Sequence, residues 1–341
     1  MTGPLDTTGF WGTPSATIDW CENNYEVTYY IAEFWNTISN LVMILLPIYG
    51  IYWSIKQRNS KKFNSFRVTN SMLACHLGLC LVGLGSWMFH MTLLYPMQLL
   101  DELPMVFGSG ILIYAHYDLF LSAYLLDQQN RRASRLSKRK SLPYKFFISR
   151  PCVASLIFAY CVLFAYIYLY LWKNPIFHEI AYGFQVFTII FLSILNIKYY
   201  QTKKRLWVMS LFYYALGFSL WNIDNNFCNY LKNSRVQLES LFGLSQDRVG
   251  ETNIKAILLN ITVVSLKSLT EFHSLWHIFT GYASFMCILF LTELSYEHHL
   301  KTATIISQKR PVSAKYFNMY YHLTSIENET GSKAHKSVKS K

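Results

Sequence analysis

Seven long apolar segments, separated by polar loops, most limit how this 341-residue chain can fold. They lie at about residues 32–53, 69–93, 98–120, 152–172, 176–197, 206–223 and 272–295. Each is close to the ~20 residues that a helix needs to cross the hydrocarbon core of a bilayer. A helix also satisfies its backbone hydrogen bonds internally, as lipid surroundings demand. The pattern therefore predicts an all-α membrane protein, a seven-transmembrane helix bundle.

The composition agrees with a membrane protein. Hydrophobic residues make up 52% of the chain and charged residues only 15%, whereas soluble domains contain about 25% charged residues. A formal net charge of +12 would suit a nucleic-acid-binding protein, but the Lys and Arg residues lie mainly in loops between apolar segments. That distribution is typical of loops beside a membrane. We therefore expect membrane lipid as a partner, and no nucleic acid.

The basic residues also predict an orientation. They are concentrated after the first, third and fifth segments, and the loop between the second and third segments contains none. The positive-inside rule then places the N-terminus in the lumen and the C-terminus in the cytosol. The chain divides into a lumenal N-terminal turn (1–31), the bundle (32–295, with a lumenal loop at 224–271) and a basic cytosolic tail (296–341).

Polar residues inside or beside the apolar segments share one end of the predicted bundle. With seven alternating segments, all of them fall on the lumenal side. Ionisable groups at membrane depth are costly and usually mark function, so this shared depth predicts a site there. The residues are Glu33, Ser86, His90, Asp101, Asp224, His273 and His277.

Three of these residues predict a zinc site. His273 and His277 are four residues apart, so they share one face of a helix, and His90 lies at the same depth. Three neutral imidazoles suit zinc and leave a fourth position for water. The alternative is that the histidines form hydrogen bonds between packed helices. We favour a catalytic zinc site because ionisable residues at this depth are usually functional.

Asp101 and Ser86 are the candidate catalytic residues. Asp101 would act as a general base for water, or it would orient a zinc-bound histidine; we favour the first role. Ser86, four residues before His90, would donate to a substrate carbonyl, or it would be a small residue at which helices approach closely. Glu102 points about 100° away from Asp101 on a helix, so we expect it to cap the helix or bind a neighbouring one.

The N-terminal stretch Asp19–Asn24, followed by Glu33, is rich in oxygen ligands of the kind that calcium takes. The spacing is not that of an EF-hand, and the same residues would suit a turn that caps the first helix. From the residues alone, both interpretations stay open.

Two cysteines are predicted to pair. Only Cys21 and Cys228 fall on the predicted lumenal side, where oxidation is permitted, while the other five lie within the segments or at a cytosolic end. We therefore predict a Cys21–Cys228 disulfide that joins the N-terminal turn to the end of the sixth segment.

Long blocks of the chain resemble the alkaline ceramidase family, from about residue 9 to residue 295. The 229–270 loop and the C-terminal tail depart from the family pattern. The matching blocks are ATIDWCENNY (16–25), YIAEFWNTISN (30–40), GSWMFHMTLLYPMQLLDELPM (85–105), WNIDNNFC (221–228) and FHSLWHIFTG (272–281).

The resemblance implies an intramembrane amidase of sphingolipid metabolism, an N-acylsphingosine amidohydrolase. It would hydrolyse ceramide, dihydroceramide or phytoceramide to a sphingoid base and a free fatty acid. Zinc would be bound by the three histidines, Ser86 and Asp101 would assist catalysis, and Cys21 and Cys228 match a family disulfide. The endoplasmic reticulum membrane is the expected location, with the Golgi membrane as second choice.

The resemblance also favours calcium at the N-terminal turn. The implied ligands are Asp19, Trp20 (through its carbonyl), Glu22, Asn24 and Glu33.

One alternative function belongs to a different class. Seven-helix receptors of the adiponectin and progestin type also have three histidines around an intramembrane zinc ion, with little catalytic turnover. They are expected to have the opposite topology, so the orientation of the chain distinguishes the two interpretations.

Overall fold

The computed structural model describes residues 8–59, 69–133, 149–200, 204–241 and 267–307. Most of the predicted 224–271 loop and of the basic tail therefore lies outside the described residues.

The described residues form a helical bundle, and seven of its helical stretches are long and apolar enough to cross a membrane. The predicted fold class is thereby confirmed. The first span combines α1 with α2, and the fourth combines α5 with a short π-helix, η3. The elements are α1 (Phe34–Ser39), α2 (Leu41–Asn59), α3 (Asn70–Thr92), α4 (Tyr95–Ala133), α5 (Arg150–Tyr166), η3 (Ile167–Leu171), α6 (Pro175–Tyr200), α7 (Arg205–Leu241) and α9 (Phe272–Ser307).

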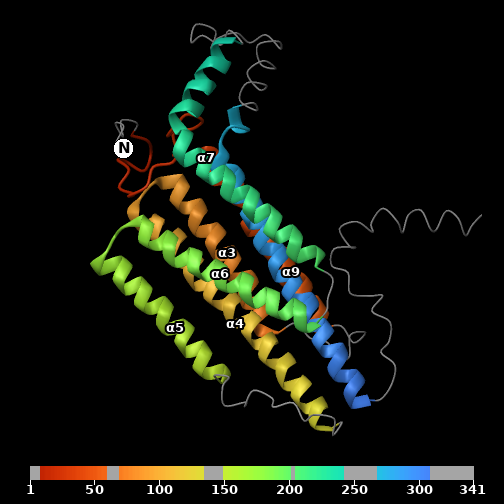
Figure 1. The fold of residues 1–341 in the computed structure, drawn as a ribbon. Helices are drawn as coiled ribbons and strands as arrows, with labels where there is room; N and C mark the ends of the chain where they lie inside the picture. The colour runs from red at the N-terminus through yellow and green to blue at the C-terminus, as the bar shows by residue number, and fades with distance from the viewer. Residues whose placement is uncertain (1–7, 60–68, 134–148, 201–203, 242–266, 308–341) are drawn as a thin grey trace, which may run out of the picture.

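Three helices run well past their predicted segments. The segments were expected to end at 120, 223 and 295, but α4, α7 and α9 continue to Ala133, Leu241 and Ser307. Hydropathy marks only the part of a helix that suits lipid, and polar residues extend it into water at little cost. In α7 the extension follows a kink at Phe227 (φ −118°, ψ 21°) and projects beyond the other helices (Figure 1).

Helices α3 and α9 form the centre of the bundle. Both pack against α1, α2 and α4, and α9 also packs along α7, while α5 lies at the edge against α4 (Figure 1). Large side chains of α9, such as Phe285 and Phe290, are fully buried in the main apolar cluster. Residues on the inner faces of α3 and α9 are therefore held in the most tightly packed part of the molecule.

The approach of α3 to α4 depends on Gly85. A Cβ atom at this position would lie 1.9 Å from the carbonyl oxygen of Leu100 and 3.0 Å from the backbone nitrogen of Asp101. Only glycine permits such an approach between two backbones. The contact brings Ser86, the next residue on α3, beside the first turns of α4.

The N-terminal segment closes the end of the bundle where α3 finishes. The last carbonyls of a helix lack partners within it. Here the carbonyl of His90 accepts from the Glu33 N–H (3.0 Å), and that of Met91 accepts from the Ala32 N–H (2.9 Å). Leu93, in the left-handed conformation (φ 50°), ends α3 and accepts from Ser15 and Ala16. We call this end of the bundle the N-terminal face.

Candidate metal centre

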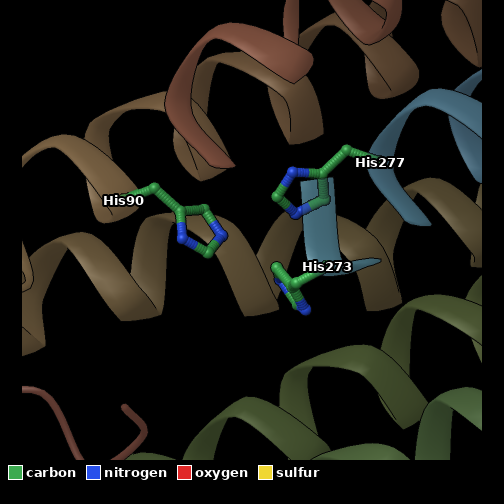
Figure 2. A group of neighbouring side chains, drawn as sticks. All are labelled: His90, His273 and His277. Atoms are coloured by element: carbon green, nitrogen blue, oxygen red, sulfur yellow. The ribbon is translucent and has the colours of Figure 1, made fainter. Parts of the chain in front are cut away.

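The three histidines meet at the N-terminal face. One ligand atom from each of His90, His273 and His277 lies within 4.8 Å of the others. His90 comes from α3 and the other two from the first turns of α9, with their rings grouped around one point (Figure 2). All three are buried, at 1–4% exposure. Among the described residues, this is the one such group of three or more His, Cys, Asp or Glu side chains.

Two of the rings are held in place by hydrogen bonds at Nδ1. His90 Nδ1 donates to Glu33 Oε2 at 2.5 Å, and His277 Nδ1 donates to the carbonyl of Asn36 at 3.1 Å. Ser39 Oγ also lies 2.9 Å from His277 Nδ1. Because each Nδ1 carries the proton, each Nε2 presents a lone pair, and Nε2 of His90 has no hydrogen-bond partner among the described residues. This tautomer is the one that metal binding needs.

His273 is positioned differently. Its ring stacks on Trp20 with centroids 3.8 Å apart, and its Nδ1 is buried with no hydrogen-bond partner among the described residues. Its backbone N–H donates to Asp224 Oδ1 at 3.3 Å, while Asp224 Oδ2 accepts from the Cys21 N–H at 3.4 Å. A carboxylate at the start of α9 satisfies free N–H groups and suits the helix dipole.

These observations fit a metal ion. The imidazoles are close together, Nε2 of His90 and Nδ1 of His273 lack hydrogen-bond partners among the described residues, and the surroundings are buried. Three imidazoles are a donor set that suits zinc, among other transition metals.

Ser86 and Asp101 lie beside this group. Ser86 is 2% exposed and is one helical turn before His90 on α3. Its hydroxyl donates a hydrogen bond to the carboxylate of Asp101 on α4. Asp101 is not one of the residues whose ligand atoms meet within 4.8 Å, and it is connected to the group through Ser86.

Glu102 faces away from Asp101, as expected. Its carboxylate accepts from the hydroxyl of Tyr168 at 2.6 Å and from the amide of Gln98 at 3.1 Å. The prediction that Glu102 binds a neighbouring helix is confirmed, because Tyr168 lies in η3.

The acidic residues of the N-terminal turn have structural partners in the free protein. Glu22 accepts from the backbone N–H groups of Trp35 (2.7 Å) and Asn36 (2.8 Å), so it caps the start of α1. Asn24 donates to Asp19 at 3.4 Å. Trp20 contributes its backbone N–H to the carboxylate of Glu33.

Charge at this turn is poorly compensated. Burial, followed by the charge of Glu33, raises the pKa of Glu22 to about 8, and burial raises that of Glu33 to about 8 as well. The charges of Asp19 and Asp224 contribute to this increase in the pKa of Glu33. Glu33 Oε1 is buried without a hydrogen-bond partner among the described residues. A cation would relieve this repulsion, and the oxygen donors suit calcium.

A disulfide joins Cys21 to Cys228, with Cα atoms 5.3 Å apart. It ties the N-terminal turn to α7 just after the kink at Phe227. The turn that contacts His273 through Trp20 is therefore covalently attached to the bundle.

Sequence reasoning missed the roles of several partners. The sequence places Glu33 at the depth of the predicted site and in the calcium turn, but it does not predict that the Glu33 carboxylate contacts His90. Asn36 and Ser39, which contact His277, were not singled out. The available signal was a run of polar residues, Asn36, Thr37, Ser39 and Asn40, at the start of an apolar segment.

The fold and site define a seven-helix membrane protein with a buried three-histidine centre, and comparisons place it more closely. A family model described as Ceramidase matches residues 12–246. Alkaline ceramidase 3 of Mus musculus is 36% identical over 312 residues, covering 91% of this chain and 92% of that protein. Alkaline ceramidase YPC1 of Saccharomyces cerevisiae is 31% identical over 293 residues, covering 84% and 78%. Putative alkaline ceramidase dcd3A of Dictyostelium discoideum is 28% identical over 305 residues, covering 84% and 89%.

The chain belongs to the ceramidase family. It is accordingly an enzyme of the hydrolase class that acts on an amide bond. The resemblance found in its sequence blocks is confirmed.

The Glu33–His90 contact yields a prediction about metal affinity. Glu33→Gln keeps the shape of the side chain but replaces the carboxyl group that contacts the His90 imidazole with an amide. Loss of such a carboxylate typically weakens metal binding by about 10- to 100-fold. Zinc content measured after equilibration in zinc buffers should fall accordingly. Glu26→Gln, which removes a partly exposed carboxylate of the same turn, should leave it unchanged. Equal zinc affinity in wild type and Glu33→Gln would contradict the role given to Glu33.

Proposed function

We propose that this chain hydrolyses the amide bond of ceramide-type lipids at a zinc centre formed by His90, His273 and His277. The proposal rests on one observation above all. A member of the ceramidase family brings three buried, neutral imidazoles from two helices within 4.8 Å at one end of its bundle. The products would be a sphingoid base and a free fatty acid.

Zinc bound there would supply a Lewis acid for the amide carbonyl and would make a water molecule more acidic. Asp101 would take the proton from that water on its carboxylate. It would then return a proton to the nitrogen of the leaving amine, because an amine anion is too poor a leaving group to depart unaided. Both transfers use one carboxylate, and Ser86 already contacts it in the free protein.

Ser86 would stabilise charge on the substrate. Its hydroxyl donates to Asp101 here, and with substrate bound we propose that it donates to the amide oxygen, where negative charge develops. The residues lie at the end of helices that are apolar enough to span a bilayer. A lipid substrate would therefore reach them from the membrane, with its chains among the helices.

Amide hydrolysis by detergent-purified protein tests this proposal. Ceramide, dihydroceramide and phytoceramide would be offered to wild type, His273→Ala and Asp101→Asn, with zinc content measured on every sample. His273→Ala should lose zinc and turnover together. Asp101→Asn should keep its zinc and lose about 10²- to 10⁴-fold in rate, the usual contribution of a general acid–base.

Glu102→Gln is the matched control for Asp101, because Glu102 is the adjacent carboxylate but binds Tyr168 and Gln98. Its rate should change far less. Stoichiometric zinc without turnover on any of the three lipids would contradict the proposal and support the receptor-type alternative. Full turnover by His273→Ala would also contradict it.

We also propose that the N-terminal turn binds calcium through Asp19, the carbonyl of Trp20, Glu22, Asn24 and Glu33. Two observations support this. The pKa values of Glu22 and Glu33 are raised to about 8, chiefly by burial and in part by acidic neighbours. Glu22 also caps α1, so the capping role and the calcium role are compatible.

Melting temperatures in calcium and in chelator separate the two roles. At a calcium concentration 100 times the Kd, a ligand stabilises a protein by about 2.7 kcal/mol, so wild type should melt at a higher temperature in calcium. Glu22→Gln should lose most of this calcium-dependent increase. If Glu22→Gln instead lowers the melting temperature equally in both conditions, the turn only caps the helix and the calcium proposal is wrong.

The location and orientation of the chain are proposals as well. We propose a multi-pass protein of the endoplasmic reticulum membrane, with the Golgi membrane as second choice and the N-terminal face in the lumen. The distribution of basic residues between the loops supports this orientation. In sealed microsomes, an N-terminal tag should resist protease while a C-terminal tag is removed. The reverse result would contradict the orientation and match the receptor-type alternative.

A further inference from the structure

Arg235 is a buried cation near the metal centre that the proposed chemistry does not use. It lies on the α7 extension beyond the kink and is 2% exposed. Among the Lys and Arg residues whose burial the structure describes, it alone is buried. Burying a guanidinium is costly unless all its donors are paired, so its contacts require an explanation.

The guanidinium group contacts two other segments of the chain. Nη1 donates to the carbonyl of Cys21 at 3.0 Å. Nε donates to the hydroxyl of Thr270 at 3.0 Å, and Nη2 donates to the carbonyl of Thr270 at 2.7 Å. Nη2 also lies 2.8 Å from Glu271 Oε2 in an ion pair with both side chains buried. The planar fork of arginine can satisfy several fixed acceptors at once, which lysine cannot do.

The two contacted segments both lead to His273. Thr270 and Glu271 come immediately before α9, and the carbonyl of Glu271 accepts from the N–H groups of Ser274 (3.1 Å) and Leu275 (3.3 Å). Glu271 therefore begins the helical turn that carries His273.

The other segment contacts the ring of His273 directly. Cys21 follows Trp20, whose ring stacks on the His273 imidazole. The Cys21 N–H also shares Asp224 with the His273 N–H. A shift of either segment relative to Arg235 would therefore move His273 or the ring packed on it.

We propose that Arg235 is a positioning residue of the metal centre. Its hydrogen bonds connect the first turn of α9 to the Trp20–Cys21 turn. They thereby hold the His273 ring in position beside His90 and His277. This inference rests on the proposed zinc centre and deepens it. Arg235 itself touches neither metal nor substrate.

The experiment uses cobalt(II) as the probe, because its visible absorption reports the geometry of its ligands. A single substitution would leave Glu271 as an unpaired buried charge and endanger folding. The principal variant is therefore Arg235→Gln combined with Glu271→Gln, which removes both charges of the pair together. Arg235→Lys tests whether charge alone is enough. Lys232→Gln, half-buried three residues earlier on α7, is the matched control.

Purified full-length proteins would be loaded with cobalt(II) and transferred to a chelator well below their melting temperatures. In the double variant, the cobalt spectrum should change and metal release should be about tenfold faster, as for other partners that orient metal ligands. Arg235→Lys should show the same two changes to a smaller extent, and Lys232→Gln should match wild type.

Each further outcome decides the matter. A double variant that melts cooperatively, with the spectrum and release rate of wild type, would refute the role of Arg235 and leave the metal centre intact. If Arg235→Lys has the cobalt spectrum and release rate of wild type, a positive charge at this position is sufficient, and the geometric role of the guanidinium is refuted. If the double variant does not fold, the test depends on Arg235→Lys alone. A wild-type spectrum and release rate in this variant would refute the positioning role of Arg235, and an altered spectrum with faster release would support it. Wild type that binds no cobalt would refute the metal centre itself, and this inference with it.

Discussion

The proposed metal centre depends on hydrogen bonds to the ring nitrogens of its histidines that point away from the metal position. An imidazole presents its Nε2 lone pair to a metal only if its Nδ1 keeps the proton. The carboxylate of Glu33 accepts a hydrogen bond from Nδ1 of His90, and the carbonyl of Asn36 accepts one from Nδ1 of His277. Both acceptors belong to α1 or to the residue just before it. This six-residue helix lies against α3 and α9 at once, so it sets the tautomers of two rings that come from different spans.

The N-terminal turn in turn fixes α1. Glu22 caps the helix through the N–H groups of Trp35 and Asn36, and the Cys21–Cys228 disulfide attaches the turn to α7. A continuous series of contacts therefore runs from the proposed calcium turn, through Glu22 and α1, to the proposed zinc centre. On this account calcium would act on catalysis by fixing ligand geometry, without touching the substrate. The carboxylate of Glu33 would belong to both proposed sites, and it would therefore be the shortest link between them.

Much of this was predictable from the sequence, and the limits have physical causes. The seven spans followed from apolar runs, because lipid demands helices of a given length. His273 and His277 could be paired from their spacing, and their meeting with His90 followed from alternation of the spans. Helix ends were less accurate, since the α7 extension past residue 223 is polar. The sequence shows a run of polar residues in α1, but it does not show which of them contact the rings, because that depends on how α1 lies between α3 and α9. Arg235 was not predictable either, because it lies in a stretch expected to be a loop.

X-ray absorption at the zinc edge, on purified protein, tests the central claim most directly. The account predicts one zinc ion per chain with about four nitrogen or oxygen ligands at about 2.0 Å, three of them showing the scattering of imidazole. The imidazole contribution should diminish when His90 is replaced. A site with sulfur ligands, or protein free of zinc that still hydrolyses ceramide, would contradict the account.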